Sequence, residues 1–239
     1  MSDDRVHGEH HKLDVLKWGL LVQKQLIEKK FSEETAAELL PIVLNEHDEG
    51  RRVAGDFEHE LKSAVLVRLR LGDYNEYKQN EIGAIANVIG NHSGITKRKN
   101  EKYRYNNKIE EILMDSLTIA DRISAIDPLR VLAYFLKHVS RNRISIKKAG
   151  EQWNLMLKVW QESIESGVAL AVKYGLDGLA SQIFQEHKSS VKFIEEYAHH
   201  NHRNFEEIIK GIRNGNDVRM FNEFFQTSLI CLPVYLRSF

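Results

Sequence analysis

One stretch decides the fold of this chain: Ala36-Ala37-Glu38-Leu39-Leu40-Pro41-Ile42-Val43-Leu44-Asn45-Glu46-His47-Asp48. Within it, Ala36, Leu40, Val43 and His47 follow one another at intervals of four, three and four residues. This is the spacing of one face of an α-helix. The stretch therefore predicts a helix whose apolar face ends in a histidine that is followed directly by an aspartate.

Signals at both ends bound this predicted helix. Ser32 has the character of an N-cap, and two glutamates follow it in what would be the first turn. Gly50 is the expected end of the helix, and Pro41 is expected to kink it because proline lacks a backbone N–H.

Helical spacing recurs on both sides of this stretch. Upstream, Val15, Trp18 and Val22 lie four, seven and eleven residues after His11, which predicts a helix from His11 to about Lys29. Downstream, helices are predicted over residues 57–71 and 77–90, from residue 108 onward, and over residues 127–138. The predicted fold class is all-α, a helical bundle.

A polar junction at residues 140–145 predicts a division of the chain. We expect a first helical domain over residues 1–142 and a C-terminal helical extension over residues 143–239, with two long amphipathic helices. Residues 219–239 are rich in phenylalanine and aliphatic side chains. This segment is expected either to pack on the first domain or to form a contact between copies of the chain.

Composition limits the classes of partner. Lys plus Arg and Asp plus Glu both total 34 residues, so the net charge is zero and no global field favours long nucleic acids or anionic membranes. Cys231 is the only cysteine, the N-terminus opens with acidic residues, and no apolar run reaches the roughly 20 residues of a membrane span. A cytoplasmic protein is expected.

Several predicted helices carry ionisable residues on or at the end of their apolar faces. They are His11, the pair His47 and Asp48, His92, and Asp121. A buried aspartate beside buried histidines is unfavourable unless a cation binds both imidazole nitrogen and carboxylate oxygen. Any one of these histidines, taken alone, is better explained as an ordinary core or surface residue, but their joint order predicts a metal centre. The other histidine cluster, His199, His200 and His202, is expected at the surface.

The ordered set resembles the HD-domain superfamily of metal-dependent phosphohydrolases. The segments that carry the resemblance are His11-Lys-Leu-Asp-Val15, Glu46-His47-Asp48-Glu49-Gly50-Arg51, Ile89-Gly-Asn-His92-Ser-Gly94 and Ala120-Asp121-Arg122-Ile123. The resemblance implies that His11, His47, Asp48 and Asp121 bind one metal ion. In members with two ions it implies that His59 and His92 complete the second site and that Asp48 bridges both, and we favour this two-ion form.

The chain departs from the family pattern next to the His-Asp pair. The family has small apolar residues before the pair and an apolar residue after it, whereas Asn45, Glu46 and Glu49 are polar. Histidine and carboxylate ligands suit manganese, iron, nickel, zinc and magnesium to differing degrees, so the sequence does not identify the metal.

The expected function is hydrolysis of a phosphate ester or anhydride by a metal-activated water, in the manner of a phosphodiesterase or nucleotidase. The resemblance suggests a small phosphorylated substrate, a nucleotide or a nucleotide-derived signal. Asp48, Arg51 and Lys97 are expected to serve catalysis, and the residues expected to bind phosphate are Arg51, Lys97, Arg98 and Lys102. The alternative for the basic loop at residues 93–107 is a solvated surface.

Two other functions share these residues. Di-iron oxygenases that resemble HD domains use much the same ligands, and iron content with oxygen consumption would distinguish them. In a non-catalytic metal-binding or interaction module, the helical fold would serve as a scaffold, and Asp48→Ala would leave its function intact.

Overall fold

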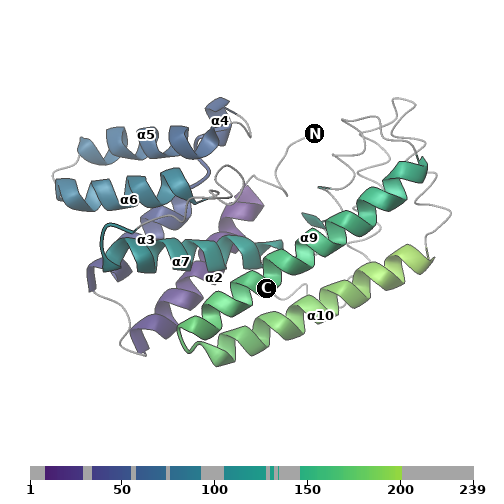
Figure 1. Cartoon of the computed structure of the whole chain (residues 1–239). Coiled ribbons are helices and arrows are strands. Elements are labelled where there is room, and N and C mark those ends of the chain that lie inside the picture. Colours follow the sequence, from purple (N-terminus) through teal and green to yellow (C-terminus); the bar gives the residue numbers. More distant parts are fainter. Residues whose placement is uncertain are drawn as a thin grey trace.

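The structure is a computed structural model, and it describes residues 9–28, 34–54, 58–73, 76–92, 105–127, 130–131, 134 and 146–200. Side chains are described for these residues except 9–10, 54, 146–154 and 193–200. The described part of the chain is helical and contains no strand, which confirms the predicted all-α class (Figure 1). None of the described helices has the length and apolar character that crossing a bilayer requires.

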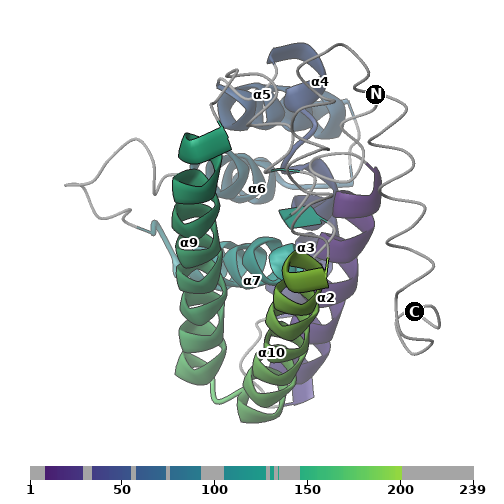
Figure 2. The same ribbon diagram turned by 90° about the vertical axis from the view of Figure 1, so that its right-hand side faces the viewer.

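The described part of the chain consists of helices that follow one another along the sequence. In chain order the helices are α2 (Glu9–Glu28), α3 (Glu34–Glu46), α4 (Arg51–Ala54), α5 (His59–Gly72), α6 (Gln79–Asn91), α7 (Lys108–Ile123), the 3-10 helix η1 (Ser124–Ile126), α9 (Ile146–Lys173) and α10 (Asp177–His200). Helices α5 and α6 lie side by side, and α9 and α10 form a second, longer pair (Figures 1 and 2).

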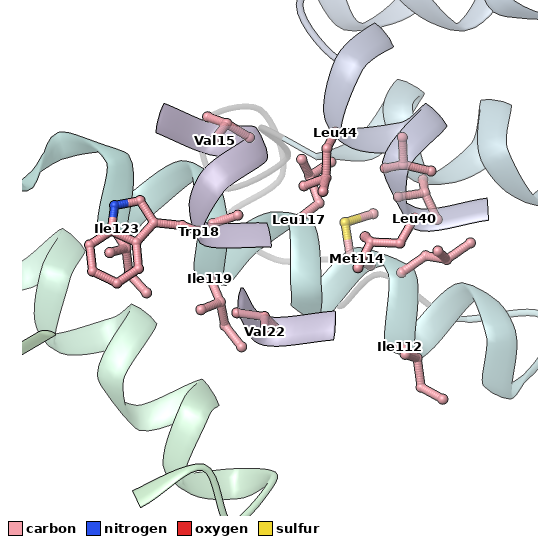
Figure 3. Close-up of a cluster of buried hydrophobic side chains, with 14 of the residues drawn as sticks. Val15, Trp18, Val22, Leu40, Leu44, Ile112, Met114, Leu117, Ile119 and Ile123 are labelled. Carbon is pink, nitrogen blue, oxygen red and sulfur yellow. The ribbon is translucent and has the colours of Figure 1, made fainter. Parts of the chain in front are cut away.

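Helix α7 is the centre of the bundle. It packs against α2, α3, α6 and α9, and most of its side chains are buried. Figure 3 shows Val22 of α2 beside Ile119 of α7, and Leu44 of α3 beside Leu117 of α7, in the cluster that also contains Val15. Because one helix is enclosed on nearly all sides, the ends of its neighbours are held at fixed positions around it.

The long pair α9 and α10 shares this core. Ile164 of α9 and Ile183 of α10 are buried in the same hydrophobic cluster as the helices of the first half. Trp160 of α9 donates from Nε1 to the carbonyl oxygen of Ala125 in η1, at 2.5 Å. The described helices of the predicted C-terminal extension therefore pack on α7 and η1, while the boundary predicted at residue 142 stays a prediction.

The largest difference from the predicted helix boundaries lies at the His-Asp pair. Helix α3 was expected to continue to about Gly50, but it ends at Glu46, and residues 47–50 form a turn that leads into the short helix α4. Helix α3 runs through Pro41, and the kink predicted at this residue stays a prediction. The predicted helix 127–138 and the apolar segment 219–239 lie wholly or largely outside the described residues.

Candidate metal centre

The predicted ionisable residues meet at one point inside the bundle. His11 comes from α2, His47 and Asp48 from the turn after α3, His59 from the first position of α5, His92 from the end of α6, and Asp121 from the last turn of α7. The side chains of His11, His47, Asp48, His59 and His92 are at most 5% exposed. The Asp121 side chain is 37% exposed and marks the open edge of the cluster.

The Asp48 carboxylate is the centre of the cluster. Its Oδ2 lies 3.4 Å from His11 Nε2 and 3.8 Å from His47 Nε2. Its Oδ1 lies 3.3 Å from His59 Nε2 and 3.6 Å from His92 Nε2. One carboxylate therefore presents each of its oxygens to a different pair of imidazoles, and we call these pairs the His11 half and the His59 half. Asp121 belongs to the His11 half, since its Oδ1 lies 3.4 Å from His11 Nε2.

Each imidazole turns Nε2 toward Asp48 and Nδ1 toward another partner. His47 Nδ1 lies 2.9 Å from the carbonyl oxygen of Leu44, and His92 Nδ1 lies 2.7 Å from that of Ile89. These carbonyls belong to the last turns of α3 and α6, where the final C=O groups of a helix lack N–H donors from the helix itself. A carbonyl can only accept, so Nδ1 of both rings carries the proton.

The cluster shifts the protonation of its members. Burial lowers the pKa of His47 to about 4, although Asp48 opposes the shift. Burial favours neutral Asp48, but contacts from the histidines outweigh it and hold the pKa of that carboxyl well below its usual range. Burial likewise disfavours the charge on Asp121, yet His11 and His47 hold its pKa below the ordinary value. For His92, the contact with Asp48 outweighs burial and raises the pKa.

His47 provides the test of whether these residues fit a metal ion. Its pKa near 4 makes the ring neutral at physiological pH, and its proton lies on Nδ1. The Nε2 lone pair is buried without a hydrogen-bond partner and faces an ionised carboxylate oxygen. A lone pair and an anion repel each other, and a cation between them would turn the repulsion into two coordination bonds.

The distances between the possible ligand atoms also agree with a bound cation. In two groups, one of His11, His47 and Asp121 and another of His47, Asp48 and His92, one ligand atom from each residue lies within 4.8 Å of the others. Imidazole nitrogen together with carboxylate oxygen suits Mn, Fe, Ni, Zn and Mg to differing degrees, and outward hydrogen bonds from Nδ1 are usual for histidine ligands. The buried His/Asp cluster could therefore hold a metal ion, whose identity the donor set does not fix.

Charged partners surround the polar residues that depart from the family pattern. Glu49 pairs with Lys12 of α2 and lies 3.6 Å from Arg52 Nε. Glu46 accepts from Arg70 Nη1 of α5 at 2.5 Å. Glu46 and Glu49 thus form ion pairs with neighbouring helices in place of apolar packing, and Asn45 donates from Nδ2 to Glu46 Oε1 at 3.1 Å.

The cationic residues predicted to bind phosphate divide into two groups. Arg51 belongs to the centre, because its Nε lies 2.8 Å from Asp48 Oδ2 and its side chain is 19% exposed. Lys97, Arg98 and Lys102, with the rest of the predicted basic loop up to residue 104, lie outside the described residues.

Three contacts of the centre were not predicted. Ser124 Oγ lies 3.3 Å from His11 Nδ1, Glu60 Oε2 lies 3.4 Å from His59 Nδ1, and Arg130 Nη1 donates to Ser124 Oγ at 2.5 Å. The sequence held one signal for Ser124, which follows Asp121 by three residues and so lies on the same side of α7 and its extension.

Comparisons with family models, with curated proteins and with solved structures found no match to this chain.

Proposed function

We propose that this protein is a metal-dependent phosphohydrolase of the HD-domain type, which cleaves a phosphate ester or anhydride of a small molecule. The observation that supports it is the position of Asp48, a buried carboxylate with two imidazoles on each oxygen. A shared carboxylate between two histidine pairs is the arrangement expected for two neighbouring divalent cations. His11, His47, Asp48 and Asp121 would hold one cation, and Asp48, His59 and His92 the other.

Bound divalent cations would supply the Lewis acidity that lowers the pKa of a water molecule and offsets the charge on phosphate oxygens. The residues of the chain would do the rest. Asp48 and Asp121 would provide the negative charge that retains the cations, and burial of the four imidazole side chains would exclude bulk water from their side of the centre. No protein nucleophile is required.

The substrate is proposed to approach along the open edge of the centre. Asp121 and Arg51 are the partly exposed members of the cluster, at 37% and 19% of their side chains. A guanidinium presents hydrogen-bond donors that match phosphate oxygens, so Arg51 would orient the substrate. That the substrate is a nucleotide or a nucleotide-derived signal rests on the family resemblance, as does the cytoplasmic location.

The test compares two buried aspartates. Asp48→Asn keeps the shape of the side chain but removes the charge shared by both halves. Asp115→Asn is the matched control, because Asp115 is equally buried but contacts Tyr105, Lys173 and Tyr174 instead of histidines. Elemental analysis and a phosphate-release screen over nucleotides with Mn²⁺ should show metal and activity in the control and neither in Asp48→Asn.

Two results would contradict the proposal. Phosphate release that survives Asp48→Asn would exclude metal catalysis at this centre. Bound iron together with substrate-dependent oxygen consumption, and no phosphate release, would assign the same residues to an oxygenase.

A further inference from the structure

The two halves of the centre have different kinds of partner for their outward imidazole nitrogens. His47 and His92 bond to main-chain carbonyls, which no substitution removes. His11 faces the hydroxyl of Ser124, and His59 faces the carboxylate of Glu60. Each half therefore contains one imidazole whose outer partner is a side chain.

Ser124 can contact His11 in only one way. A hydroxyl group has one proton to donate and two lone pairs that accept. Its proton points to the main-chain oxygen of Asp121, 2.6 Å away, and one lone pair accepts from Arg130. The remaining contact at 3.3 Å then requires the proton to lie on Nδ1 of His11. This leaves Nε2 of His11 with a lone pair that faces Asp48 and Asp121.

Glu60 has the corresponding position in the other half. Its carboxylate can only accept when ionised, and Oε2 lies 3.4 Å from Nδ1 of His59. The side chain of Glu60 is 12% exposed, so little water competes for this contact. The proton of His59 is thereby favoured on Nδ1, and Nε2 is directed to Asp48 Oδ1.

We infer that Ser124 and Glu60 are positioning residues, each of which fixes the proton and ring orientation of one ligand and so tunes the metal affinity of one half separately. This inference rests on the proposed function, because it assumes that the His/Asp cluster binds metal ions. Arg130 also supports Ser124, because its hydrogen bond occupies the other lone pair of the hydroxyl. Loss of such an outer partner typically weakens metal binding roughly ten- to a hundredfold.

The experiment measures Mn²⁺ binding to the full chain after chelation, with free Mn²⁺ followed by electron paramagnetic resonance. Ser124→Ala should weaken one class of site roughly ten- to a hundredfold, and Glu60→Ala should weaken the other. Ser124→Thr keeps a hydroxyl group at this position and should keep the Mn²⁺ affinity of the wild type. Ser116→Ala is the matched control, since Ser116 is also buried, two turns earlier in α7.

A double-mutant cycle separates positioning from general damage to the fold. If Ser124 acts through His11, then Ser124→Ala should have no further effect on Mn²⁺ affinity in a His11→Ala background. In the Zn²⁺-loaded, ¹⁵N-labelled protein, the Nδ1 proton of His11 should exchange slowly with water in the wild type and in Ser124→Thr, and rapidly in Ser124→Ala.

The outcomes distinguish this inference from the proposed function. The inference would be overturned if Ser124→Ala bound Mn²⁺ as tightly as the wild type does. It would also be overturned if Ser124→Ala and Glu60→Ala weakened the same class of site equally. Neither result would contradict the proposed phosphate hydrolysis. Metal binding that follows the expected pattern without phosphate release would uphold the inference and reject the proposed reaction. A wild-type chain that binds no Mn²⁺ or Zn²⁺ would overturn both.

Discussion

Arg51 and a metal ion would compete for the same carboxylate oxygen. Arg51 Nε lies 2.8 Å from Asp48 Oδ2, the oxygen that faces His11 and His47. Without a bound cation, the guanidinium compensates part of the buried negative charge of Asp48. When a divalent cation takes over that compensation, the attraction between Arg51 and Asp48 weakens. The guanidinium is then available to an anionic substrate at the open edge of the centre.

Arg51→Ala is therefore expected to separate substrate binding from metal binding. Loss of charge-assisted hydrogen bonds to phosphate should lower kcat/KM roughly ten- to a hundredfold. Metal affinity should stay equal or rise, because a competitor for Asp48 has gone. Steady-state kinetics on whichever nucleotide is hydrolysed, with Mn²⁺ titration in parallel, measures both quantities.

Arg52→Ala is the matched control for this prediction. Arg52 is the next residue in α4, its side chain is 64% exposed, and it contacts Glu49 instead of Asp48. It should leave kcat/KM within a factor of a few of the wild type. If Arg51→Ala instead lowers metal affinity, the guanidinium supports the centre and does not compete with the cation.

The sequence predicted the inner residues of the centre better than the outer ones. His11, His47, His92 and Asp121 each lie on or at the end of an apolar helical face, and such a face can be read from spacing alone. His59 was expected from the family resemblance. Ser124 was not predicted as a partner of His11, because 113 positions separate them and only the crossing of α2 and η1 brings them together.

The turn between α3 and α4 brings the His-Asp pair to the centre. Its last residue, Gly50, donates its N–H to Ser63 Oγ of α5 at 2.7 Å. A Cβ atom at Gly50 would lie 2.1 Å from the carbonyl oxygen of His59 and 2.6 Å from the backbone nitrogen of Ser63. Backbone atoms cannot yield as a flexible side chain can, so the turn approaches α5 this closely only with glycine.

Gly50→Ala should consequently lower both the stability of the fold and the binding of metal at the His/Asp cluster. The added methyl group would push the turn away from the start of α5, separating Asp48 from His59. We expect a lower free energy of unfolding and loss of Mn²⁺ binding in the His59 half, measured by urea unfolding and metal titration. Gly83→Ala in α6, where an added Cβ meets nothing, should keep metal binding and stabilise the helix by about 0.5–1 kcal/mol. Wild-type Mn²⁺ binding in Gly50→Ala would show that the turn tolerates the displacement.

The contact between α9 and α10 contains a buried histidine. The rings of His187 in α10 and Trp160 in α9 have centroids 4.8 Å apart in an edge-to-face arrangement, and His187 Nε2 is buried without a hydrogen-bond partner. Burial lowers the pKa of His187 below 6.5, although Glu165 opposes the shift. The folded state therefore favours the neutral ring.

This gives a pH dependence with a definite sign. Above 6.5 the ring is neutral in both states; below it the unfolded chain takes up a proton that the folded chain resists, so acidification favours unfolding. The free energy of unfolding of the wild type should fall more between about pH 8 and about pH 5.5 than that of His187→Gln, as measured with urea. Parallel pH profiles for the two proteins would show that His187 does not contribute.

Helix ends were harder to predict than helices. The apolar spacing of α2, α5, α6 and α7 was visible in the sequence, and all four were predicted within a few residues. The end of α3 was placed near Gly50 because the apolar stripe continues through His47. That histidine instead leaves the helix and bonds through Nδ1 to the carbonyl of Leu44. A residue whose side chain caps the end of its own helix has the same sequence spacing as a residue inside the helix, so spacing alone does not distinguish the two.

At the scale of the whole molecule, the centre depends on α7 being fixed. Asp115 in α7 accepts from Tyr174 at 2.7 Å and from Lys173 at 2.7 Å, both at the end of α9, and from Tyr105 at 3.0 Å. This network around the buried Asp115 lies about two turns from Asp121 and ties the long helical pair to the helix that carries one of the predicted ligands. Packing of α9 and α10 thus supports the helix that carries Asp121, while neither α9 nor α10 contributes a candidate metal ligand among the described residues.

Metal binding should accordingly stabilise the entire fold. The centre draws residues from α2, α5, α6, α7 and the turn after α3, so unfolding of the bundle would separate its ligands. A ligand that binds only the folded state at a hundred times its Kd adds about 2.7 kcal/mol, which for a chain of this length is roughly 5 to 10 °C in Tm. Thermal unfolding followed by circular dichroism, with chelator and then with increasing Mn²⁺, measures this shift. Asp115→Asn should unfold at a lower temperature and keep the shift, whereas His47→Ala should lose it. A Tm independent of Mn²⁺ in the wild type would mean that the buried histidines and aspartates are held together without a cation.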